Sequence, residues 1–133
     1  MRTAIDPPTV PAPPGGWYSH AVRGDVGTVA LLFVSGQVAL DESGEIAHPG
    51  DMARQSQRVV ATLDRILAAQ GATFDDVVNI RTYVTDFALL PAYGAVRARH
   101  VTGAPPTSTT VEVAGLHRPG AVVEVDLVAA VGR

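Results

Sequence analysis

The sequence contains no cysteine and no lysine, and each absence excludes a class of chemistry. Without cysteine, the chain forms no disulfide, no thiolate nucleophile and no cysteine metal site. Without lysine, it forms no catalytic Schiff base, which excludes pyridoxal-type mechanisms. Proteins without disulfides are typical of reducing compartments, so we expect a cytoplasmic location.

Charge is scarce as well. Charged residues make up 17% of the 133 residues and hydrophobic residues 47%, and the formal net charge is −3. This acidic balance argues against nucleic-acid binding. No apolar run is long enough for a membrane span or a signal peptide, so no membrane partner is expected. The four histidines are scattered without the spacing of metal ligands, so we expect no metal.

The composition changes once along the chain. Residues 1–15 contain five prolines and predict a stiff, extended N-terminal lead-in. Residues 16–133 show no repeat, charge run or linker, and their length fits one domain.

Hydrophobic periodicity predicts the secondary structure of this domain. Strands are expected over 17–22, 28–40, 75–86, 107–115 and 121–131, and helices over 50–71 and 89–101. Asp51 is a candidate N-cap and Gly71 a candidate stop for the first helix. Gly36 interrupts an apolar strand, which predicts a bulge or a close backbone approach. Strands grouped around two helices predict an α+β fold, with both helices on one face of a mixed sheet.

The other face of this sheet carries polar side chains and has no helix left to cover it. We place there Asn79, Arg81, Tyr83, Ser108, Thr110, Glu112, Glu124 and Asp126, interspersed with valines. An uncovered face of mixed polarity is a natural contact between subunits, so we expect a homo-oligomer. The alternative is a face in contact with solvent.

The ordered motifs WYSHAV, FVSGQVAL, NIRTYVTD, PPTSTTVEVAGL and VVEVDLVAAV resemble those of the RidA/YjgF (Rid) family of imine deaminases. The resemblance implies a chorismate-mutase-like subunit and a homotrimer whose sheets form a central β-barrel. Family members bind small molecules in clefts between subunits. They hydrolyse 2-imino acids, and the enamine tautomers, to 2-keto acids and ammonia without a metal or organic cofactor. Some carry an endoribonuclease label, which the acidic balance of this chain does not favour.

The resemblance also assigns roles to single residues. Glu124 matches the glutamate that orients or activates the attacking water. Tyr18 matches a tyrosine near the entrance, and Ser35, Gly36 and Gln37 match a turn that lines the pocket. Ser108 stands where the family places the arginine that grips the substrate carboxylate.

This substitution puts the best-known reaction of the family in doubt. A hydroxyl offers one neutral hydrogen bond in place of a charge-assisted pair, so we expect no efficient deamination of simple 2-imino acids. We place Ser108 and Thr110 at the intersubunit cleft. Arg81 either supplies a substitute anion grip or forms an ion pair with Glu112 or Asp126.

Two hypotheses follow. The first is a trimeric hydrolase that acts on an imine, an enamine or a related small carbonyl compound. The second is a non-catalytic trimeric ligand-binding or regulatory module, in which Tyr18, Ser108 and Thr110 hold the ligand. His20 and His117 are candidate neighbours of the pocket, whereas Arg97, Arg99 and Arg118 are interpreted as surface charges.

Overall fold

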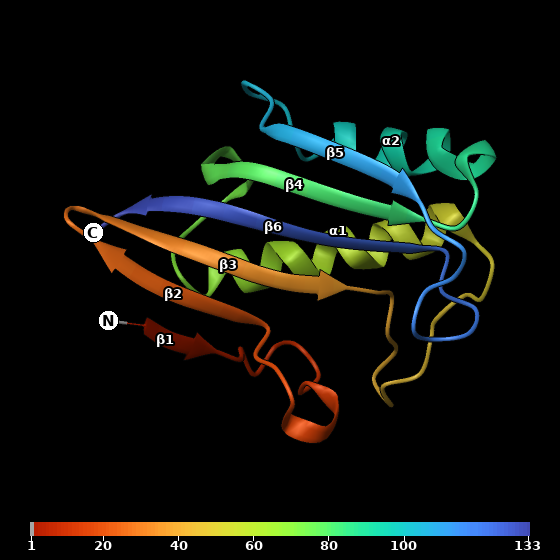
Figure 1. Cartoon of the computed structure of the whole chain (residues 1–133), viewed down its shortest axis with the longest axis horizontal. Coiled ribbons are helices and arrows are strands. Elements are labelled where there is room, and N and C mark those ends of the chain that lie inside the picture. Colours follow the sequence, from red (N-terminus) through yellow and green to blue (C-terminus); the bar gives the residue numbers. More distant parts are fainter. Residues whose placement is uncertain (1) are drawn as a thin grey trace.

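The computed structural model describes residues 2–133 and consists of one six-stranded sheet and two α-helices. The strands are β1 (Arg2–Ile5), β2 (Ala21–Val26), β3 (Val29–Gln37), β4 (Val77–Val84), β5 (Thr107–Glu112) and β6 (Val123–Gly132), and the helices are α1 (Met52–Ala68) and α2 (Leu90–Ala98). Short 3₁₀ turns lie at Pro14–Gly16, Phe74–Asp76 and Phe87–Leu89. The sheet order is β1-β2-β3-β6-β4-β5, and β4 and β5 form its parallel pair. Both helices lie on one side of the sheet (Figure 1), so the predicted α+β class is confirmed.

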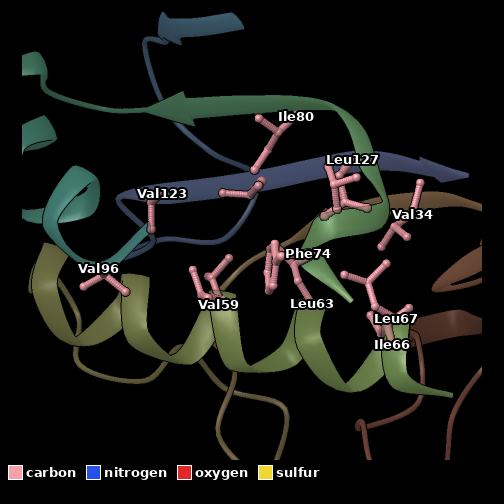
Figure 2. Close-up of a cluster of buried hydrophobic side chains, with 14 of the residues drawn as sticks. Val34, Val59, Leu63, Ile66, Leu67, Phe74, Ile80, Val96, Val123 and Leu127 are labelled. Carbon is pink, nitrogen blue, oxygen red and sulfur yellow. The ribbon is translucent and has the colours of Figure 1, made fainter. Parts of the chain in front are cut away.

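The core lies between α1 and the sheet (Figure 2). The apolar stripe of α1, including Val59, Leu63 and Leu67, is fully buried and faces Val123 and Leu127 of β6. α1 begins as predicted at Asp51, whose carboxylate accepts a hydrogen bond from the backbone N–H of Arg54 at 3.1 Å. The predicted helix and its buried face are therefore confirmed.

The N-terminal segment contains a strand that the sequence analysis did not predict. β1 pairs antiparallel with β2 and forms one edge of the sheet, while Met1 lies outside the described residues. The strand predicted over 17–22 begins later, at Ala21, because Trp17 and Tyr18 lie in an exposed loop before it. That loop forms one wall of the site described below.

β4 contains an irregularity that reverses two predicted orientations. Its register with β6 shifts between Val77 and Asn79. Val77 is therefore buried, whereas Val78 is 47% exposed, contrary to the prediction. An extra residue in one strand moves the side chains before it to the other face, and sequence alternation alone does not reveal it.

The predicted orientation of β5 is also wrong. Ser108 is aligned with Ile80 and Thr110 with Thr82 in the parallel pair. Aligned residues of parallel strands point to the same face, and Ile80 and Thr82 are buried on the helix side. Ser108 and Thr110 therefore lie on the helix side, opposite the open face that carries Glu124. A register one residue away would have reversed this result, and only the pairing with β4 determines the register.

No helix among residues 2–133 has the length and apolar character needed to cross a bilayer.

Candidate active site

A half-open cavity of about 590 Å³ lies at the end of β3. Four predicted site residues line it together: Tyr18, Ser35, Gly36 and Glu124. The remaining lining residues come from the loop before β2, from the segment after β3 and from the loop before β6, and are Pro14, Gly15, Trp17, Val38, Leu40, His117 and Arg118.

A β-bulge brings the main chain of β3 against Glu124. The register with β6 pairs Val34 with Leu127 and Gln37 with Val125, which leaves Ser35 and Gly36 facing one residue of β6. A Cβ atom added to Gly36 would lie 2.6 Å from Oε2 of Glu124. Both predictions for Gly36, the bulge and the close approach, are therefore confirmed.

The electrostatics of the cavity raise the pKa of Glu124. Burial raises the pKa of this half-buried carboxyl, and the nearby charge of Asp126 raises it further, while His117 opposes the shift. Burial also raises the pKa of Tyr18, with a contribution from Glu124 that Arg118 opposes. A carboxylate with a raised pKa is a better proton acceptor, which suits a group that activates water.

Gln37 lies behind the cavity wall instead of lining it. Its buried amide donates hydrogen bonds to the carbonyl of Ser35 at 3.1 Å and to Nδ1 of His20 at 3.2 Å. This assigns the His20 proton to Nε2, which donates to the carbonyl of Pro11 at 2.7 Å. The Ser35 hydroxyl in turn donates to the carbonyl of Ser19 at 2.7 Å. These bonds fix the main chain that faces Glu124.

Arg81 does not line the cavity. It forms an ion pair with Asp126, which is one of the two roles that the sequence predicts for it. Its Nε is 2.7 Å from Oδ1 of Asp126. The hydroxyl of Tyr83 donates to the other oxygen of Asp126 at 3.1 Å. Both acidic oxygens of Asp126 therefore have partners on the open face.

Ser108 and Thr110 do not line this cavity. The Ser108 hydroxyl accepts a hydrogen bond from Nη1 of Arg97 at 3.0 Å. Arg97, which the sequence indicates as a surface charge, belongs to α2, and its guanidinium contacts Ser108. A cation from α2 therefore lies beside the Ser108 hydroxyl.

Sequence analysis missed Arg118, the cation that lines the cavity. Its Nη2 donates to the carbonyl of Gly44 at 2.6 Å and lies 3.7 Å from Oε2 of Glu45. The loop that carries Arg118 is held by the fully buried Gln55, whose amide donates to the carbonyl of Gly120 at 2.8 Å. Because Arg118 lies in a turn, no periodic pattern indicates which way its side chain points. His117, a candidate neighbour of the pocket, does line it. Within residues 2–133, no group of three metal-ligating side chains comes together.

The fold and site define a class: an α+β domain with one layer of helices and a cavity on the open side of its sheet. A family model described as Endoribonuclease L-PSP matches residues 9–131. The chain belongs to this family, which is the RidA/YjgF family that its motifs resemble.

Individual relatives agree with this assignment. The chain is 40% identical to Protein DfrA of Myxococcus xanthus over 114 residues, which cover 86% of this chain and 85% of that protein. It is 33% identical to the 3-aminoacrylate deaminase RutC of Acinetobacter baylyi, with 88% of this chain and 89% of RutC covered. The crystal structure of the Rid-family protein YyfA from Yersinia pestis superposes with a TM-score of 0.86 at 26% identity, covering 98% of this chain and all of that one.

Proposed function

We propose that the chain is a hydrolase of small imines or enamines in which Glu124 activates the attacking water. The observation that carries this proposal is the position of Glu124, a half-buried carboxyl with a raised pKa that touches the bulged main chain at Gly36. The name of the relative RutC, a 3-aminoacrylate deaminase, supports an enamine as substrate.

The reaction that this site supports is hydrolysis of a carbon–nitrogen double bond. Glu124 accepts a proton from water while the water oxygen attacks the imine carbon. The proton passes from Glu124 to the nitrogen, which gives a carbinolamine. Glu124 then transfers the hydroxyl proton of this intermediate to the nitrogen, the C–N bond breaks, and ammonia leaves as the carbonyl forms. An enamine enters the same sequence after it gains a proton at carbon and loses one from nitrogen, which yields its imine tautomer.

We further propose that the working assembly is a homotrimer formed through the open face. This face exposes large apolar side chains, including Phe33 at 53% and Val111 at 38%. Ser108 and Thr110 lie on the opposite side of the sheet from Glu124, so they do not line this cavity within one chain. A role for them in ligand binding would need a contact with another chain at the sheet edge that β5 forms, in addition to the open face.

The test is to offer freshly generated 2-iminopropionate, 3-aminoacrylate and bulkier enamines and to follow the carbonyl product against buffer. We expect Glu124→Gln to abolish the acceleration and Glu42→Gln, at an exposed carboxylate outside this cavity, to retain it. If wild type and Glu124→Gln match buffer on every substrate, the hydrolase proposal fails and a non-catalytic ligand-binding module takes its place.

A further inference from the structure

The cavity contains an arginine that none of the proposed chemistry uses. Arg118 lines the same space as Glu124, and its side chain is 28% exposed. Its Nη2 is held by the carbonyl of Gly44, so the guanidinium is fixed in position. Within residues 2–133, this guanidinium makes no second hydrogen bond, although it carries five N–H donors.

The charge of Arg118 is only weakly compensated. Its acidic neighbour is Glu45, whose carboxylate is 3.7 Å away and 77% exposed. An ion pair at this separation and exposure contributes little, because water screens it. The guanidinium therefore remains available to an anion that enters the cavity.

The mouth of the cavity also carries an aromatic surface. Trp17 is 88% exposed and lines the cavity, and its indole covers Gly15, where a Cβ atom would lie 3.3 Å from Nε1. Pro14, Val38 and Leu40 add apolar surface to the same space. Planar groups stack favourably on an indole face, and burial of an exposed tryptophan gains further free energy.

We propose that Arg118 is the anion-binding residue of this cavity and Trp17 its stacking surface, so that the ligand is a small planar carboxylic acid. A carboxylate matches the fork of a guanidinium and carries a single charge. A doubly charged phosphate is disfavoured because Glu45 and Glu124 lie beside the same space. In the setting of the proposed function, the ligand directs its carboxylate to Arg118 and its reactive carbon to Glu124.

The inference rests on the cavity of the proposed function but is tested by binding alone. Trp17 is the single tryptophan of the chain, so its fluorescence reports occupancy of the cavity mouth. Benzoate is the planar acid, cyclohexanecarboxylate the non-planar acid and benzamide the neutral planar compound. We expect benzoate to change Trp17 emission at about millimolar concentration, and the other two compounds to bind at least several-fold more weakly.

Two substitutions and one control variant test Arg118. Arg118→Gln is expected to weaken benzoate binding, followed by calorimetry, about 10-fold to 100-fold, because a charge-assisted pair is lost. Arg99→Gln, at an exposed arginine of α2's C-terminal end, is the matched control and should bind as wild type does. Glu45→Gln removes the competing carboxylate and is expected to strengthen benzoate binding about two-fold to five-fold.

The Glu45 variant separates ligand binding from a structural role. If Arg118 only anchors the loop at Gly44, loss of Glu45 leaves benzoate affinity unchanged, and that result overturns the proposal. Equal affinity for benzoate and benzamide, or no benzoate binding to wild type, overturns it as well. If benzoate binds as expected but no imine is turned over, the proposed hydrolase function is contradicted, whereas the proposal of a planar carboxylic acid as ligand stands.

Discussion

Replacement of Gly36 by alanine is the sharpest test of how the bulge positions the carboxylate. The added Cβ would lie 2.6 Å from Oε2 of Glu124 and 2.9 Å from its Cδ. Ordinary contact begins near 3.4 Å, so the carboxylate must move by at least about 0.8 Å. The atoms in the way belong to the end of a flexible side chain, and the cavity gives them space to move into.

The expected loss of stability is therefore small and the expected loss of function large. Forcing one side chain off its preferred rotamer costs about 0.5–1.5 kcal/mol, which for a domain of this size lowers Tm by roughly 2–6 °C. A misplacement of about 1 Å in a catalytic group costs about 100-fold in rate. Because the carboxyl moves toward the open cavity and loses burial, we also expect the pKa of Glu124 to fall toward its ordinary value.

Thermal unfolding and a carboxyl-carbon NMR titration of Glu124 measure these effects without any substrate. Gly24→Ala is the matched control, because no heavy atom lies within 4 Å of its added Cβ. We expect this control to leave the pKa of Glu124 unchanged and to stabilise the fold by up to about 1 kcal/mol. An unchanged pKa of Glu124 in Gly36→Ala would refute the close approach of Gly36 to the Glu124 carboxyl. A fall in Tm much larger than expected would show that the Glu124 side chain cannot move out of the way.

Three further predictions concern pH, reaction scope and assembly. Because its pKa is raised in the folded chain, Glu124 contributes its full stability below the ordinary glutamate pKa and loses that contribution as pH rises through the raised pKa. Glu124→Gln should therefore raise Tm at about pH 8 and not at about pH 4. Ser108→Arg should raise the rate of 2-iminopropionate hydrolysis. The double variant with Arg97→Ala should raise it further, because the guanidinium groups of Arg97 and the introduced arginine would otherwise repel each other. No gain in either variant would show that the site differs from that of the imine deaminases at more than this one residue. Phe33→Glu should reduce the mass of the proposed trimer in light scattering. Ala68→Glu, at an exposed position of α1, should leave the mass unchanged. A monomeric wild type at micromolar concentration would contradict the proposed assembly.

Sequence reasoning succeeded where one local pattern determines the structure. The stripe on α1 repeats with the period of a helix, and its residues Val59 and Leu63 are fully buried. Gly36 was identified because a glycine inside an apolar strand has few explanations other than a bulge or a close contact.

Sequence reasoning failed where the structure depends on pairing between distant segments. The faces of Ser108 and Thr110 follow from their alignment with β4, which no feature of β5 itself specifies. The direction of Arg118 depends on the carbonyl of Gly44, more than 70 residues earlier in the chain. Side chains in turns have no periodic partner, so their contacts are known only once the fold brings the loops together.

The two walls of the cavity differ in how freely evolution can change them. Glu124 and Gly36 belong to central strands, where a substitution disturbs the sheet and its packing. Pro14 and Trp17 belong to the loop before β2, and neither is among the core residues of the described chain. Surface loops tolerate replacement far better than core strands. Ligand preference can therefore change through residues 14–17 while the wall that carries Gly36 and Glu124 stays constant, and a new specificity requires no new fold.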